Sequence, residues 1–205
     1  MKNKFFYGVG IATFMLASCG GAEEAAEDLH ENIEDVVEEV IVETKSYSVD
    51  TAASIVNWTT MDGEEKGHWG TVKVLEGSFS TEGDVITEAS LKMNMNTVMS
   101  TDENGGENLT GHLMAPDFFD VNQYASSEFT FDRHEEGKIY GTLNAAGAEF
   151  PVEAEATLTE GTVEVAEFII DMSTLPFYVA EREKEPNQEK WHDPNVTISA
   201  TIVGK

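Results

Sequence analysis

The sequence predicts an all-β domain of about eight antiparallel strands, and two features of the chain after Lys45 support this prediction. Apolar or aromatic residues alternate there with polar ones, which is the period of a strand with one buried face. The alternating runs are joined mostly by short turns rich in Gly, Asp and Glu. So many strands within residues 46–205 form a single domain, either a sandwich or a closed up-and-down barrel.

The first predicted strands lie in the first half of this domain. Residues 54–61 place Val56 and Trp58 on one face, and Val72 and Val74 alternate before Gly77. Residues 85–95 give the clearest pattern, with Val85, Thr87, Ala89, Leu91, Met93 and Met95 on one face and Ile86, Glu88, Ser90, Lys92, Asn94 and Asn96 on the other. We expect the first of these faces to be buried and the second to meet solvent.

The second half of the domain repeats the pattern. Strands are expected over residues 128–133, 138–144, 150–158, 163–172 and 196–203. The parity of the apolar residues slips between Val165 and Phe168, which predicts a β-bulge near Ala166 and Glu167. Between the two halves, residues 107–115 have a helical pattern that ends at Pro116.

Residues 1–18 have the three parts of a cleavable export signal. Lys2 and Lys4 precede a short apolar run over residues 5–16, and small residues follow it. The run is shorter than the ~20 apolar residues that a membrane-spanning helix needs. Leu16-Ala17-Ser18-Cys19 resembles the lipobox of bacterial lipoproteins, in which the cysteine carries the lipid. Cys19 is also the only cysteine, so it cannot form an internal disulfide. An ordinary signal peptide with an incidental cysteine is the alternative.

We expect an acylated Cys19 to hold the protein on a membrane, because two or three acyl chains form a stable anchor. Gly20 follows the cysteine instead of the aspartate that retains some lipoproteins on an inner membrane. The outer membrane is therefore expected, and whether the protein faces the periplasm or the cell surface stays open.

Residues 19–45 are expected to form an acidic spacer between the anchor and the domain. Leu29, Ile33, Val36, Val37 and Val40 have helical spacing within a run of acidic residues. The segment is either a charged, partly helical spacer or a helix that docks an envelope protein partner. Loss of the leader leaves 39 acidic residues against 10 of the 12 basic ones, so nucleic acid is not expected as a partner.

A family resemblance rests on residues 108–121, NLTGHLMAPDFFDV, followed by SEFTF at 127–131. Together with YSVD at 47–50, SIVNW at 54–58, GTL at 141–143 before Gly147, PV at 151–152 and FIID at 168–171, this order resembles the YceI-like family. The resemblance covers residues 46–204. It implies a lipocalin-like antiparallel β-barrel whose apolar interior holds one long isoprenoid, such as a polyprenyl alcohol or a quinone tail.

The candidate ligand-binding residues are the apolar side chains expected to face the barrel interior. They are Val56, Trp58, Phe79, Leu91, Met93, Met95, Phe118, Phe129, Phe131, Leu143, Phe168 and Ile170, with the smaller Ala89, Ala154 and Ala156 among them. An eight-stranded barrel is about the smallest that can hold one slender ligand, but side chains can also fill it. The alternative is therefore a closed, filled barrel that serves as an envelope scaffold or interaction module.

We expect neither a metal or other cofactor nor catalysis. The five histidines, His30, His68, His112, His134 and His192, have no paired ligand spacing, and no zinc motif is present. The chain has no Gly-x-Ser-x-Gly sequence and no glycine-rich phosphate loop before a helix. A hydrolase or isomerase acting on the bound lipid stays open only as the default for a protein with a pocket. The expected function is a membrane-anchored protein that sequesters or carries an isoprenoid.

Overall fold

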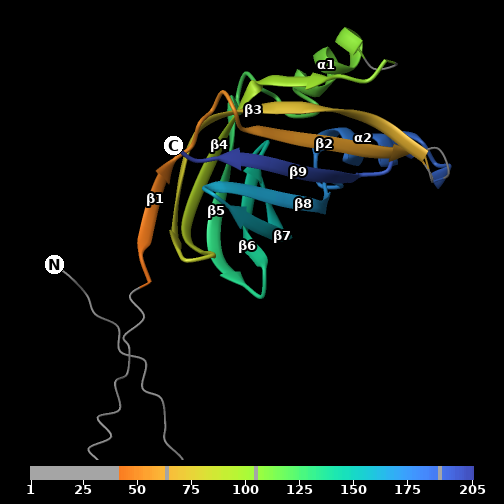
Figure 1. Ribbon diagram of the computed structural model, residues 1–205. Coiled ribbons are helices and arrows are strands. Elements are labelled where there is room, and N and C mark those ends of the chain that lie inside the picture. The colour runs from red at the N-terminus through yellow and green to blue at the C-terminus, as the bar shows by residue number, and fades with distance from the viewer. Residues whose placement is uncertain (1–41, 63–64, 104–105, 189–190) are drawn as a thin grey trace, which may run out of the picture. The chain divides into compact units, whose positions relative to one another are not determined.

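The computed structural model describes residues 42–62, 65–103, 106–188 and 191–205. The predicted leader, Cys19 and most of the predicted acidic spacer lie outside these residues. Over the described residues the chain forms nine strands and two helices (Figure 1). In chain order they are β1 (Thr44–Ser48), β2 (Ile55–Asp62), β3 (Glu65–Glu82), β4 (Val85–Ser100), α1 (Gly106–Met114), β5 (Ser126–Glu135), β6 (Lys138–Ala145), β7 (Ala148–Thr159), β8 (Thr162–Asp171), α2 (Pro176–Lys184) and β9 (Asn195–Val203).

The sheet closes on itself as an up-and-down barrel of eight strands. Each strand from β2 to β9 pairs antiparallel with the next, and β9 pairs back with β2 from Ile55↔Thr201 to Thr60↔Val196. The barrel predicted from the family resemblance is therefore confirmed, and the sandwich is excluded. Closure also provides hydrogen-bond partners for the backbone N–H and C=O groups that would stay unpaired at the two edges of an open sheet.

The short strand β1 extends the wall on one side. It pairs with the second half of β3, from Thr44↔Glu82 to Ser48↔Ser78, while β2 pairs with the first half of the same edge. Strand pairing thus begins at Thr44, two residues before the expected domain start at Ser46. The Tyr47 ring stacks on Phe79 with a centroid distance of 4.8 Å, which joins this strand to the barrel core.

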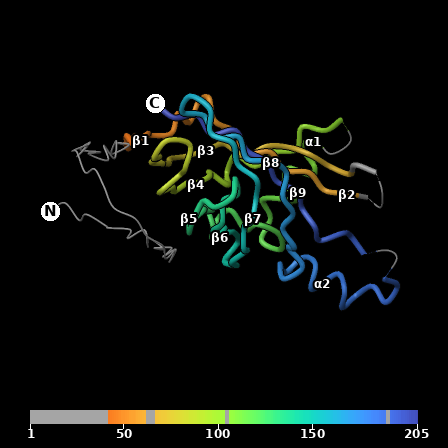
Figure 2. The backbone as a smooth tube through the Cα atoms, turned by 60° about the horizontal axis from the view of Figure 1, so that its bottom comes forward, coloured from red at the N-terminus to blue at the C-terminus, as the bar shows by residue number. Residues whose placement is uncertain are grey.

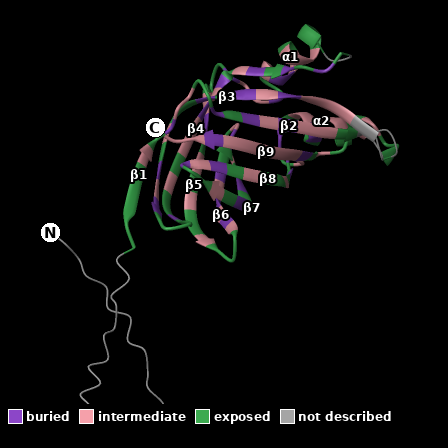
Figure 3. Ribbon diagram, in the orientation of Figure 1, coloured by how far each residue is buried: buried purple, intermediate pink, exposed green. Residues whose placement is uncertain are grey.

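Side chains alternate between the barrel interior and solvent, as the sequence pattern predicts. In β7, Phe150, Val152, Ala154 and Ala156 are buried and the residues between them are exposed. Figure 3 shows these alternating buried and exposed bands on the strands around the barrel. The hydrophobic core therefore lies inside the barrel.

Two β-bulges change which residues face inward. Ser80 pairs with Glu88 but Thr81 pairs with Ile86, so Thr87 is an extra residue in β4. As a result Ile86 is buried and Val85 is 48% exposed. The expectation that Val85 and Thr87 share the inner face with Met93 is therefore wrong. The bulge predicted in β8 is confirmed, because the register shifts between Val165 and Phe168.

Both helices lie at the same end of the barrel, which we call the helix end. In the up-and-down order, the β2–β3 turn, the α1 connection from β4 to β5 and the α2 connection from β8 to β9 all leave from this end. The opposite end, which we call the turn end, carries the β3–β4, β5–β6 and β7–β8 turns and the C-terminus. Figures 1 and 2 show α1 and α2 away from the C-terminus. Helix α1 agrees with the predicted residues 107–115, whereas α2 is not anticipated by the sequence pattern. Neither helix of the described chain is long and apolar enough to cross a bilayer.

Candidate functional site: the barrel cavity

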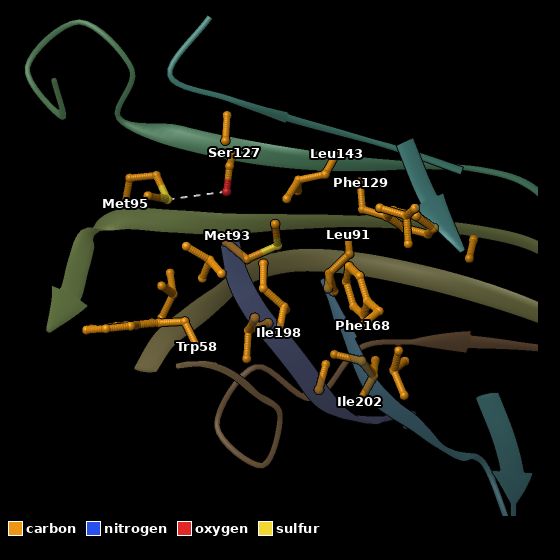
Figure 4. Close-up of a pocket in the computed structure, with 18 of the residues that line it drawn as sticks. Trp58, Leu91, Met93, Met95, Ser127, Phe129, Leu143, Phe168, Ile198 and Ile202 are labelled. Carbon is orange, nitrogen blue, oxygen red and sulfur yellow. Dashed lines mark hydrogen bonds between the residues drawn. The ribbon is translucent and has the colours of Figure 1, made fainter. Parts of the chain in front are cut away.

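The barrel interior contains a cavity with about 1320 Å³ of empty volume, including the part that is open to solvent. All eight barrel strands contribute lining residues, and Leu113, Phe118 and Phe119 contribute from α1 and the segment after it. Figure 4 shows Leu91 and Met93 of β4, Phe168 of β8 and Ile202 of β9 directed into this space.

The structure brings eleven of the twelve candidate ligand-binding residues together in the cavity lining: Val56, Trp58, Phe79, Leu91, Met93, Met95, Phe118, Phe129, Phe131, Leu143 and Phe168. Ile170 is buried in the core but is not part of the lining. Of the small residues, Ala89 lines the cavity, whereas Ala154 and Ala156 belong to the surrounding core. Whether these side chains bind a ligand is the subject of the proposal below.

The sequence pattern did not identify several lining residues that lie next to irregularities in strand pairing. Ile86 directly precedes the extra residue Thr87 of the β4 bulge, and Val98 lies where the β3–β4 register shifts between Thr71 and Lys73. Met172 follows the last residue of β8, and its backbone N–H donates to Pro194 O at 2.9 Å. Strict alternation excludes Ile86 and Val98 from the inner face, so no simple strand pattern could identify them.

Three side chains with polar groups, Trp58, Thr60 and Ser127, line the cavity near the helix end, and the exposed Ser78 and Ser90 border it nearer the turn end. The Thr60 hydroxyl accepts a hydrogen bond from the His68 backbone N–H at 2.9 Å. The Ser127 hydroxyl is buried and donates to Met95 Sδ at 3.2 Å, as the dashed line in Figure 4 shows. Trp58 is 8% exposed, and its Nε1 has no hydrogen-bond partner within the described part of the chain.

Aromatic side chains form two layers at the helix end. Phe118 and Phe119 line the cavity, with their ring centroids 4.8 Å apart. Phe177 and Tyr178 of α2 pack against Phe118, at centroid distances of 5.5 and 5.9 Å. Burial raises the pKa of Tyr178 to about 12, so its hydroxyl stays neutral under ordinary conditions. The second layer packs against the cavity-lining Phe118 and comes from the helix that the sequence pattern did not predict.

A buried carboxylate lies beside the cavity and joins three segments. The Asp102 side chain has no exposed surface; it accepts a hydrogen bond from Ser100 Oγ, and its Oδ2 lies 3.3 Å from His68 Nδ1. None of these three residues lines the cavity. They connect β3 and β4 to the loop that leads into α1, so the arrangement positions the helix end. No group of three or more His, Cys, Asp or Glu side chains suited to a metal ion occurs in residues 42–62, 65–103, 106–188 and 191–205.

Comparisons with known proteins give the same fold. A structure of a polyisoprenoid-binding domain from Saccharophagus degradans, implicated in plant cell wall breakdown, is 16% identical with a TM-score of 0.50, covering 76% of this chain and 95% of that one. The BcnA protein of Burkholderia cenocepacia is 15% identical with a TM-score of 0.52, covering 75% and 98%. No curated protein matches the chain significantly. The model of the YceI-like domain matches residues 47–203, which is nearly the whole described barrel. The chain therefore belongs to the YceI-like family.

Proposed function

We propose that this protein binds a long apolar isoprenoid, of the polyprenyl or quinone type, in its barrel and sequesters or carries it. The cavity is the observation that carries the proposal, because it is lined mainly by apolar side chains from all eight barrel strands. Met93, Met95 and Met172 are part of this lining, and flexible thioether side chains adapt well to a flexible chain. The structural similarity to a polyisoprenoid-binding domain supports the same ligand class.

The physical benefit of such a carrier is the removal of apolar surface from water. Each square ångström of apolar surface transferred from water contributes roughly 25 cal/mol. A free polyprenyl chain in an aqueous compartment would therefore be unstable by many kcal/mol relative to a membrane. An apolar barrel lowers this cost while leaving the ligand chemically unchanged, so we propose binding and not catalysis.

The test is organic extraction of the full-length protein from its native host, followed by mass spectrometry. Met93 is 5% exposed and lines the cavity, whereas Met99 on the same strand is 43% exposed. We expect Met93→Trp to fold and to lose the lipid, because the larger side chain occupies the cavity. Met99→Trp is the matched control, with the same chemical change on the outer surface, and should retain the lipid.

A lipid-free wild type together with a strongly destabilised Met93→Trp would contradict the carrier proposal. Overpacking a filled core costs roughly 1–3 kcal/mol, so that result would identify the interior as packed. The barrel would then be a scaffold or interaction module, and the acidic tail would be the segment to test for an envelope protein partner.

We further propose that Cys19 is acylated and anchors the protein to the outer membrane. The lipobox-like residues 16–19 and the absence of any other cysteine support this proposal. We expect Cys19→Ser to move the protein from the detergent phase to the aqueous phase and to remove the excess mass over the polypeptide. Ser18→Ala keeps a small residue before the cysteine, so both the detergent partitioning and the excess mass should stay unchanged. Detergent partitioning of Cys19→Ser with an unchanged mass excess would show that the anchor lies elsewhere.

A further inference from the structure

We infer that the bound ligand ends in a neutral hydrogen-bond acceptor and that the indole N–H of Trp58 binds this acceptor near the helix end. The inference rests on the proposed function and deepens it, because it specifies the headgroup and its direction in the barrel. A carbonyl or hydroxyl oxygen, as on a quinone or a prenyl alcohol, is the chemistry that fits.

The buried or half-buried polar side chains of the cavity lining lie at one end only. Ser78 and Ser90 also border the cavity nearer the turn end, but both residues are exposed to solvent. Toward the turn end, the lining side chains include Phe79, Ile86, Phe131, Ile139, Val163 and Ile202. Toward the helix end, Thr60 lies near the end of β2 and Ser127 near the start of β5. Trp58 is opposite Gly70, which in turn pairs with Ser100, the last residue of β4. Trp58 therefore belongs to the same polar half, and a ligand with one polar end is favoured in one direction.

Trp58 holds its donor in a fixed position. Its ring lies over Gly70, where an added Cβ would be 2.6 Å from Trp58 Cζ2 and 1.9 Å from the Met99 carbonyl oxygen. Indole Nε1 can donate a hydrogen bond but cannot accept one. A buried donor without an acceptor is unfavourable, and Trp58 Nε1 has none within the described residues. The complementary ligand group is thus an acceptor.

Ser127 offers a second hydroxyl donor in the same half of the cavity. Its hydrogen bond to the Met95 thioether uses a weak acceptor, so exchange for a ligand oxygen is favourable. The Thr60 hydroxyl is already engaged with the His68 backbone, because it accepts from the N–H at 2.9 Å and donates to the carbonyl oxygen at 3.4 Å. The cavity therefore presents donors to the ligand, which agrees with an oxygen-bearing headgroup.

Charge argues against a phosphorylated headgroup. The residues lining the cavity include no Lys, Arg or His, and the chain has a formal net charge of −27. Burial of a phosphate without a cationic partner would be strongly unfavourable. The cavity is thus expected to distinguish a neutral prenyl compound from a prenyl phosphate with the same tail.

The test compares three probes of equal chain length on the full-length protein after lipid extraction: a prenylated benzoquinone, a prenyl phosphate and a hydrocarbon. We expect the wild type to bind the quinone best. Trp58→Phe should weaken quinone binding about three- to tenfold, the loss of one hydrogen bond, and leave hydrocarbon binding unchanged. Trp69→Phe is the control, because Trp69 does not line the cavity. Comparing two probes on one variant separates loss of the hydrogen bond from a general loss of folding.

A second measurement reports the direction of the ligand. The chain has three tryptophans, so the variant with Trp69→Phe and Trp191→Phe contains only Trp58. A quinone ring bound beside Trp58 should quench its fluorescence, whereas the hydrocarbon should not. Quinone binding with unchanged Trp58 emission and with equal affinity for Trp58→Phe would overturn the inference but leave the carrier proposal intact. If the phosphate bound best, the neutral headgroup would be wrong. If none of the three probes bound, the carrier proposal itself would fail.

Discussion

His134 links a local irregularity of β4 to a protonation state. At the bulge, the Ile86 backbone N–H donates to His134 Nδ1 at 2.9 Å. Only a neutral imidazole with Nδ1 unprotonated can accept this bond. Burial also lowers the pKa of His134, because the charged form is less well solvated. The side chain therefore supports the bulge only while it is uncharged.

We predict that this histidine makes stability depend on pH. Its folded-state pKa is lowered, so its contribution is present above the unfolded pKa of about 6.5 and is lost as pH falls below that value. His134→Asn keeps an acceptor but does not titrate. The free energy of unfolding, measured by urea denaturation from pH 8 to pH 5, should fall more steeply for the wild type than for the variant. Identical pH profiles for the two proteins would show that His134 has no such role.

Strand parity predicts most of the cavity lining, and its failures have a physical origin. The bulge in β8 is visible in the sequence because the apolar positions themselves change parity between Val165 and Phe168. The bulge at Thr87 is not visible, because Val85 and Ile86 are both apolar and either could face inward. Only the pairing with β3 decides that Ile86 is buried. Likewise Ile170 has the correct parity, but parity does not tell a core residue from one that borders the cavity.

At the scale of elements, α2 is the part of the fold that the sequence pattern does not predict. The last four residues of α2 are all charged. The two most buried residues are Leu175, directly before the helix, and Tyr178 in its first turn. No apolar period of three to four residues therefore continues along it. What orders the helix is its contact with the barrel end, including the packing of Phe177 and Tyr178 on Phe118. Such tertiary contacts are not visible in a local pattern.

We predict that Leu175 attaches α2 to the barrel. Leu175 is 1% exposed, so Leu175→Ala should leave a cavity and lower the free energy of unfolding by about 2–5 kcal/mol. Val179, within α2, is 43% exposed, and Val179→Ala should change the free energy of unfolding by less than about 0.5 kcal/mol. Denaturant titration of both variants measures the difference. Equal, small effects would mean that α2 contributes little to the stability of the barrel.

At the scale of the whole molecule, β1 decides where the folded domain begins. Gly161 and Gly204 leave room for Tyr47, since a Cβ at these positions would lie 2.8 and 2.7 Å from its side-chain atoms. The Tyr47 ring also stacks on Phe79. These contacts make β1 part of the barrel even though most of its residues are exposed.

We therefore predict different behaviour for two shortened chains. A chain that begins at Glu43 retains β1 and should unfold at the wild-type temperature. A chain that begins at Asp50 loses β1, the half-buried Tyr47 and the buried Val49. It should unfold about 5–15 °C lower, because loss of these packed side chains costs about 3–5 kcal/mol. Differential scanning calorimetry provides the measurement. Equal midpoints for the two chains would assign β1 no stabilising role.

The pairing of β2 with β9 also constrains how the chain is made. Residues 55–60 pair with β3 on one side, but their partners on the other side are residues 196–201, so the pairing of β2 is completed only by the last strand synthesised. Contacts of such long sequence separation slow folding, since a large loop must close before they form. A nascent chain that stalls before Asn195 presents unpaired edges on both β2 and β8. Such edges are templates for strand addition between molecules, so incomplete translation products of this protein are expected to aggregate and to need rapid proteolysis.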